Sequence, residues 1–306
     1  MKKYFSFIIL ISLLFLSCKS KEKDPYIQEA LRIAEISYKS AISNEMDKLT
    51  TPIEKEIAEA MQNNDIKQVE ILCEQNPQVI ERTYSNENYY SIIHYAAVFD
   101  NVDAMETLLK SGCNPNLLSD EDISPLMYSV LSDLKMMGIR KTDSRIFELL
   151  LNAGADPNVH YDGQSLLMII INKSLPYFNE NIEKVRLLID SGLIDINEEN
   201  ENSYNALCYA LCYGYIDYIY LLLEKGAKAK SFYCKEGDVE TLTTPTSCLR
   251  NCLYDLKSEA YKKKLKCIEM LKQQGFDYYS EPVPPRIEEI IRNKYQAKYK
   301  KILENY

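Results

Sequence analysis

The chain has 306 residues, and 45 aspartates and glutamates against 36 lysines and arginines give it a net charge of −9. The acidic excess lies in residues 51–230, where 28 acidic residues outnumber 14 basic ones, so the sequence argues against a nucleic-acid ligand. The sequence has only two histidines, and it shows no glycine-rich phosphate loop and no paired carboxylates in an apolar setting. It therefore indicates no catalytic residue, cofactor or small-molecule substrate. We therefore predict that the protein is not an enzyme.

The first 17 residues have the features of a signal peptide. Two lysines precede an apolar run over residues 5–16, which is too short to span a membrane because a spanning helix needs about 20 apolar residues. The sequence Phe15-Leu16-Ser17-Cys18 resembles a bacterial lipobox, although the strict pattern has leucine where Phe15 stands. The resemblance implies that Cys18 is lipidated and anchors the protein in the cell envelope, facing the periplasm or the cell surface. Lys19 and Ser20, instead of aspartate, follow the cysteine, which by resemblance to the sorting rules of some bacteria favours the outer membrane. A secreted protein without a lipid is the alternative.

Residues 18–50 are predicted to contain the lipidated cysteine, a short charged tether and one helix. Ile27, Leu31, Ala34 and Tyr38 fall on one face of this helix. We expect that face to cover the open flank of the repeats that follow, and a coiled coil with a partner is the alternative.

A helix-turn-helix unit can be read from Ser91 to Leu118. Ser91 is suited to cap the first helix, and Gly112 can take the left-handed conformation that ends the second. The unit resembles an ankyrin repeat, whose pattern Thr-Pro-Leu-His-x-Ala is matched by residues 91–96. The resemblance implies a structural role for His94, which would bond adjacent turns. His160 is expected in a loop as a polar surface residue.

The pattern recurs along the chain, and Ser124 follows Ser91 by 33 residues, which is the ankyrin period. The predicted capping residues are Ser91, Ser124, Ser165, Asn205 and Ser247. The predicted helix stops are Gly112, Gly154, Gly192, Gly226 and Gly275. An earlier, degenerate unit spans about Pro52 to Pro77, and its first helix is predicted to start at Thr50 or Thr51. We therefore predict an all-α ankyrin-repeat solenoid of about six helix-turn-helix units over residues 51–280.

Unequal spacings predict extra residues in several units. Insertions between paired helices are expected at about Leu134–Ser144, Pro176–Asn181 and Leu256–Lys264. The segment from Gly226 to Ser247 is longer than the other finger loops and indicates an enlarged finger that carries Cys234 and Gly237. Such growth is either functional or neutral change in a surface loop.

Residues 281–306 are predicted to form a capping helix. Pro284 and Pro285 stop the repeat pattern, and Ile287, Ile291 and Ile302 then mark an amphipathic helix. A repeat stack needs such a polar-faced cap at its end.

Eight cysteines besides Cys18 suggest a competing hypothesis. Cys208 and Cys212, and Cys248 and Cys252, are each spaced as neighbours on a first helix. Four thiols on adjacent helices could hold zinc or form disulfides, but such positions also suit small core residues. We favour the core reading and predict no metal.

The ankyrin resemblance implies that first helices and fingers form a concave face that binds a protein. The predicted partner-binding residues on that face are Tyr95, Phe99, Tyr128, Tyr209 and Tyr213. Their rings are expected to be exposed on that face, and the enrichment of tyrosine in binding hot spots makes them the expected anchors. The predicted function is protein–protein interaction by a lipid-anchored envelope protein. An exported effector with a foreign target and a thiol-redox or metal-binding protein are the alternatives.

Overall fold

The computed structural model describes residues 49, 51–80, 91–119, 121–135, 144–172, 181–236 and 239–306. The chain divides into two compact units, residues 1–159 and 160–306, and each unit is described here by itself. The predicted signal peptide, Cys18, the tether, the N-terminal helix and most of the first two insertions lie outside the described residues. Within the described ranges, no helix is both long enough and apolar enough to cross a membrane.

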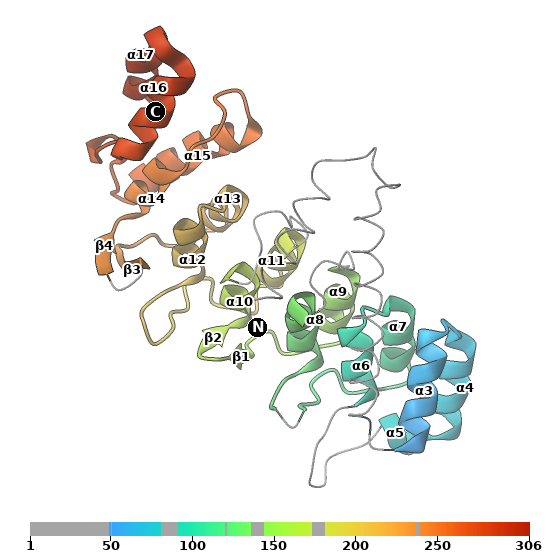
Figure 1. The fold of residues 1–306 in the computed structure, drawn as a ribbon. Coiled ribbons are helices and arrows are strands. Elements are labelled where there is room, and N and C mark those ends of the chain that lie inside the picture. The colour runs from blue at the N-terminus through green and yellow to red at the C-terminus, as the bar shows by residue number, and fades with distance from the viewer. Residues whose placement is uncertain are drawn as a thin grey trace, which may run out of the picture. The chain divides into compact units, whose positions relative to one another are not determined.

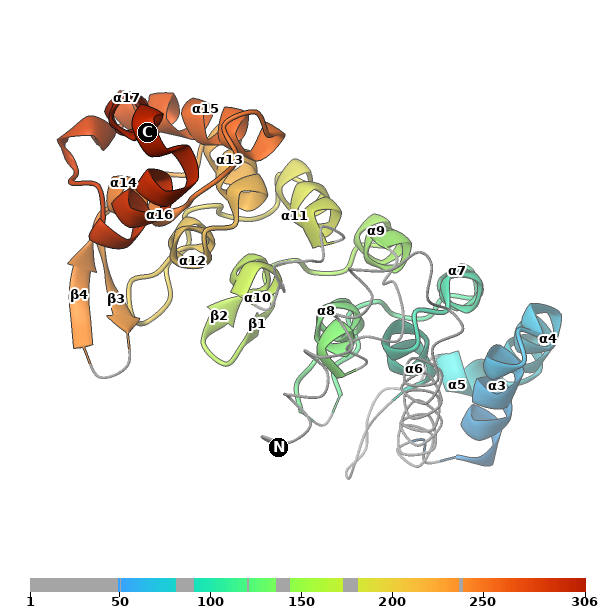
Figure 2. The same cartoon turned by 45° about the horizontal axis from the view of Figure 1, so that its top comes forward.

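The described part of the first unit consists of three helix pairs and one short helix. They are α3 (Pro52–Gln62), α4 (Ile66–Gln75), α5 (Pro77–Ile80), α6 (Ile92–Val98), α7 (Val102–Lys110), α8 (Pro125–Lys135) and α9 (Ser144–Asn152). The first helices of the pairs, α3, α6 and α8, contact one another in that order, and the second helices α4, α7 and α9 do the same (Figures 1 and 2). The unit is therefore a two-layered stack of helix pairs.

The second unit repeats this arrangement and adds two hairpins and a C-terminal extension. It contains β1 (His160–Tyr161), β2 (Gln164–Ser165), α10 (Leu166–Asn172), α11 (Asn181–Asp190), α12 (Ala206–Tyr213), α13 (Ile216–Glu224), β3 (Phe232–Glu236), β4 (Val239–Thr243), α14 (Pro245–Asn251) and α15 (Glu259–Gln273). The extension comprises the short 3-10 helix η1 (Tyr278–Ser280), α16 (Pro285–Tyr295), a second 3-10 helix η2 (Gln296–Lys298) and α17 (Tyr299–Asn305). The first helices α10, α12 and α14 again stack in sequence, as do α11, α13 and α15.

The helix starts agree with the predicted caps except in the last pair. Thr51 forms a capping box with Glu54, and Asn205 accepts a bond from the backbone of α12. The prediction for α14 is wrong, because its capping residue is Thr244, whose hydroxyl accepts from the Ser247 N–H at 3.0 Å. Pro245 follows at the first helical position, where its fixed φ and missing N–H are tolerated.

The predicted glycine stops are confirmed. All five have positive φ values between +68° and +95°. Residues other than glycine adopt such values only at a cost in conformational free energy. Gly214 is a further stop, at φ +67°, and a Cβ placed there would lie 2.9 Å from the Cys252 Sγ atom. The end of α12 therefore requires glycine for space as well as for conformation.

Two predictions for the C-terminal part need correction. The extra residues expected at Leu256–Lys264 partly extend α15, which begins at Glu259, instead of forming a loop throughout. The single capping helix is in fact two helices, because the backbone reverses at Gln296, where φ is +45°. Ile287, Ile291 and Tyr306 then form a small core between α16 and α17.

Candidate protein-binding groove

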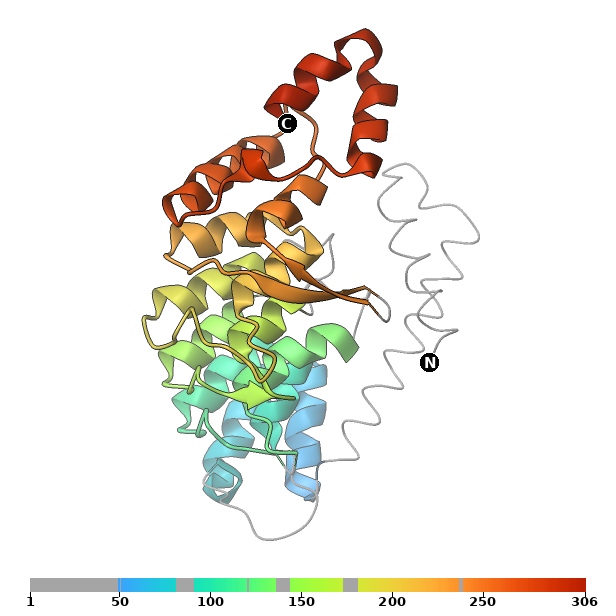
Figure 3. The same cartoon turned by 90° about the vertical axis from the view of Figure 1, so that its left-hand side faces the viewer.

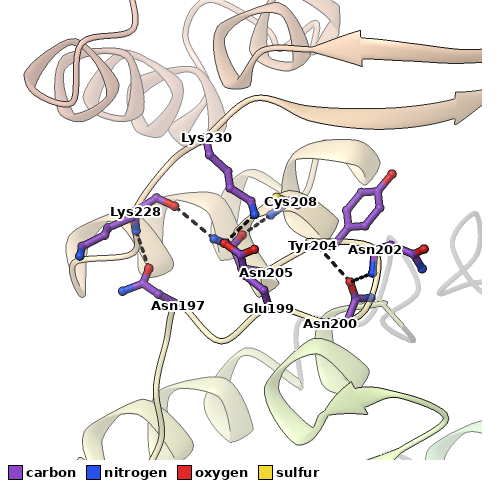
Figure 4. Close-up of polar contacts among 9 residues, drawn as sticks. All are labelled: Asn197, Glu199, Asn200, Asn202, Tyr204, Asn205, Cys208, Lys228 and Lys230. Carbon is purple, nitrogen blue, oxygen red and sulfur yellow. Dashed lines mark hydrogen bonds and ion pairs between the residues drawn. The ribbon is translucent and has the colours of Figure 1, made fainter.

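The finger loop before α12 is fixed by a series of asparagines (Figure 4). The Asn197 side chain accepts from the Lys228 N–H at 2.7 Å, and the Asn205 side chain donates to the Lys228 carbonyl at 3.2 Å. Asn205 also accepts from the Cys208 N–H, so one side chain both caps α12 and ties its finger to the next. Glu199 and Lys230 add an ion pair at 2.6 Å. These bonds fix the base from which the next finger leaves.

That next finger is the predicted enlarged one, and the structure shows it as the antiparallel hairpin β3–β4 (Figure 3). Phe232 is buried against Tyr204, with ring centroids 5.7 Å apart, and anchors the base of the hairpin. Tyr233 lies directly opposite Leu242 in the strand register, so both side chains lie on one face. Tyr233 is 56% exposed and Leu242 is 58% exposed. The hairpin therefore presents an apolar cross-strand pair to solvent.

One wall of the hairpin borders a groove of about 600 Å³, which we call the hairpin groove. It is lined by the end of α12 (residues 211–214), by β4 (residues 241–243), by α14 and the residues after it, and by α16. Tyr213, Leu242 and Ile290 contribute apolar surface to it. Among the described residues that line it, Arg286 is the only charged one, and its side chain is exposed. The groove therefore combines these apolar side chains with polar ones, among them Thr241, Thr243, Ser247 and Asn251, and with one positive charge.

Two buried basic side chains hold the α16 side of this groove in place. Arg250 in α14 donates to the Tyr278 carbonyl at 3.2 Å, and its guanidinium lies 4.0 Å from the centre of the Tyr278 ring. The Lys264 ammonium donates to the Cys252 carbonyl at 3.0 Å and lies 3.7 Å from the centre of the Tyr306 ring. Burial lowers the pKa of Lys264 to about 7. These contacts join α14 and α15 to the C-terminal extension.

Three of the predicted binding residues are buried in the first unit, which corrects the expectation that their rings are exposed. Tyr95 and Tyr128 are each 1% exposed, and Phe99 is also buried. The Tyr95 hydroxyl accepts from the Gln62 side chain in α3, and its ring centroid lies 4.6 Å from that of Phe99. Tyr128 packs edge-on against His94, at 5.3 Å. These rings fill the space between stacked repeats.

The two predicted residues in the second unit remain at least partly accessible. Tyr209 is half-buried, and its hydroxyl accepts from the Asn200 amide at 3.0 Å. Tyr213 is 49% exposed and lines the hairpin groove. Its hydroxyl donates to Asn172 at 2.8 Å and its ring stacks on Tyr215 at 5.2 Å, which fixes its orientation. Of the five residues, Tyr213 is therefore the one that the structure places in the groove.

The histidines have the predicted structural and surface positions. His94 is fully buried, its Nδ1 accepts from the Ser91 N–H at 3.1 Å, and its Nε2 lies 3.1 Å from the Leu117 carbonyl oxygen. Because Nδ1 accepts a bond from a backbone N–H, the ring is neutral and carries its proton on Nε2. His160 is exposed on β1 and pairs with Glu198.

The cysteines only partly agree with the core reading. Cys208 and Cys248 are buried and Cys252 is partly buried, but Cys212 is exposed. Cys252 lies just after α14 instead of within it, and its thiol donates to the Cys248 carbonyl at 3.3 Å. Across the part of the chain that the structure describes, no three His, Cys, Asp or Glu side chains are grouped so that they could hold a metal ion.

The hairpin residue Leu242 and the α16 residue Arg286 were not predicted as site residues. The long spacing from Gly226 to the next cap was the signal for the hairpin, since it marked an enlarged finger. No comparable signal marked Arg286, because its role depends on where the C-terminal extension packs.

Comparisons with known proteins give the following. No curated protein matches the chain. Among solved structures, it is similar to the crystal structure of an ankyrin repeat domain from Acinetobacter baumannii AYE, with 22% identity and a TM-score of 0.49, covering 72% of this chain and 98% of that chain. Residues 88–120 match a family model described as ankyrin repeat, and residues 135–232 match one described as ankyrin repeats in three copies. The two family matches and the stacked helix pairs establish that the chain contains ankyrin repeats.

Proposed function

We propose that the chain binds a partner protein and that the hairpin groove is its binding site. Ankyrin repeats indicate a protein-interaction module. The observation that carries the choice of site is the group of accessible apolar side chains around the groove, among them Tyr213 and Leu242. Exposed apolar groups gathered at a concave site are typical of interaction surfaces, and burying them on binding supplies affinity.

The lipobox-like sequence supports a second part of the proposal. Cys18 carries a lipid that holds the ankyrin repeats at the bacterial cell envelope, at the outer membrane. The partner is then a protein of the same compartment.

Site-specific photo-cross-linking in intact cells tests the binding site. A benzophenone amino acid replaces Tyr213 in one strain and Leu193 in another, because Leu193 is also well exposed but does not line the groove. We expect a discrete cross-linked protein from position 213 that is absent, or much weaker, at position 193. Identical products at both positions, or none at position 213, would contradict the proposed site.

A further inference from the structure

The edge of β4 that borders the hairpin groove is an open strand edge. Glu236 and Val239 are paired across a loop of only two residues, so Glu236 and Val239 form the hydrogen-bonded pair that closes the hairpin. Hydrogen-bonded and non-hydrogen-bonded residue pairs alternate along an antiparallel ladder. The backbone of Thr241 therefore bonds to β3, whereas the backbone N–H and C=O of Leu242 point away from β3. No hydrogen bond joins these two groups to another described residue. β4 lines the groove and β3 does not, so the open edge faces the groove.

We propose that an extended segment of a partner protein binds in the hairpin groove as a third strand paired with β4. The inference rests on the proposed function and specifies how that site recognises its partner. An open edge offers backbone donors and acceptors that only another extended backbone can satisfy in register. The added strand makes the edge bonds at Leu242 and lies between β4 and the walls formed by α12 and α16.

The lining residues define the chemistry of this segment. In a strand, every second side chain lies on the same face, so one set of partner side chains lies beside Leu242. Leu242, Tyr213 and Ile290 favour an aliphatic or aromatic residue there. Arg286 has no ion pair with a described residue, and none of the described residues that line the groove carries a carboxylate, so the segment carries an acidic residue that reaches Arg286. The occupant is thus an extended peptide with alternating apolar residues and at least one Asp or Glu.

Selection from a phage-displayed library of random linear peptides provides the probe. We expect the peptides bound by the whole protein to share an apolar residue and an acidic residue at a fixed separation. Binding of a selected peptide should fall about tenfold or more with Arg286→Glu, which changes an exposed side chain. Arg292→Glu is the matched control, because Arg292 is also exposed on α16 but does not line the groove, and it should bind as the wild type does.

Backbone methylation of the selected peptide distinguishes strand addition from other modes of binding. N-methyl groups placed at successive residues should weaken binding about tenfold at every second position, where the N–H bonds to β4, and much less at the positions between. Leu242→Pro removes the edge N–H and should also abolish binding, whereas Leu242→Val retains it and should bind within severalfold. The methylation series leaves the protein unchanged, so it holds even if Leu242→Pro disturbs the hairpin.

Several outcomes overturn the inference. One is a methylation series in which the loss of binding does not alternate between positions. Another is a library that yields no peptide that competes for the groove. A third is self-association of the protein, seen by light scattering and abolished by Leu242→Pro, because this result would assign the strand edge to a second copy of the chain. If a partner still cross-links at position 213 while any of these results is found, the proposed binding site stands but binding by strand addition is wrong. Loss of the Tyr213 cross-link removes the proposed site itself.

Discussion

At the scale of single residues, tyrosines at the same position of different repeats differ in exposure, because the residues around them differ. Tyr95 and Tyr128 follow their helix caps at the same offset as Tyr209, yet the first two are buried and the third is half-buried. The burial comes from partners in other repeats, such as Gln62 for Tyr95 and His94 for Tyr128. The repeat pattern predicts where these tyrosines lie on their helices, but it does not predict which residues of other repeats contact them. The exposure of the rings could therefore not be predicted.

His94 makes the first unit sensitive to acid. Burial lowers the pKa of His94 from 6.5 to about 4. Between these values the unfolded chain binds a proton that the folded chain does not, so the free energy of unfolding falls as the pH drops from 6.5 towards 4. The full loss is about 3 kcal/mol, and above pH 6.5 this group contributes no pH dependence.

Urea unfolding of the wild type and His94→Gln over pH 4 to 7 tests this expectation. The variant should be less stable at pH 7, because it loses the fitted bonds to Ser91 and Leu117, but the difference between the two proteins should shrink as the pH falls. Carboxylates titrate in both proteins and cancel in the difference. A constant difference across the range would show that His94 does not titrate on unfolding.

At the scale of elements, local signals predicted the helix pairs well and the additions to them poorly. Caps and glycine stops act within a few residues, so Ser91, Asn205 and the five glycines could be located from the sequence. The predicted cap of α14 differs from the observed one by three residues, because threonine and serine can both cap a helix and Thr244 and Ser247 lie close together. Pro245, at the first helical position, is the local signal that favours Thr244. The break at Gln296 depends on packing of α17 against α16, which periodicity does not report.

The helix α9 provides a test of the stacking. Leu150 is fully buried, and α9 packs against both α7 and α8, so Leu150→Ala should lower the free energy of unfolding by about 2–5 kcal/mol. Leu151→Ala is the matched control, since Leu151 lies in the same helix but is partly exposed, and it should cost clearly less. Urea unfolding gives the two values. Hydrogen exchange should increase most in α7, α8 and α9, because repeats contact only their neighbours. Equal costs for the two variants would show that this register of α9 is wrong.

At the scale of the whole molecule, charge differs along the chain in a way that bears on the partner. Residues 51–230 have a net charge of −14, whereas residues 231–306 have 14 basic and 11 acidic residues, a net charge of +3. The hairpin groove is formed mainly by residues of the second range. An acidic partner segment is therefore repelled by most of the repeats and attracted to the part that carries Arg286, which favours binding there over the other fingers.

The anchor is the remaining prediction at this scale, and it rests on the sequence before the repeats. A single acyl chain binds a membrane only marginally, whereas the several chains of a bacterial lipoprotein hold it firmly. We therefore propose that lipidation of Cys18 decides where the whole protein resides. Cys18→Ala should abolish lipid labelling and block processing after residue 17. Cys212→Ala is the matched control, because Cys212 is exposed and lies outside the lipobox, and it should leave labelling unchanged. Metabolic labelling with a fatty-acid probe, followed by detergent extraction of the membranes, measures both effects. A Cys18→Ala protein that is still labelled and still extracted with the membranes would exclude Cys18 as the anchor.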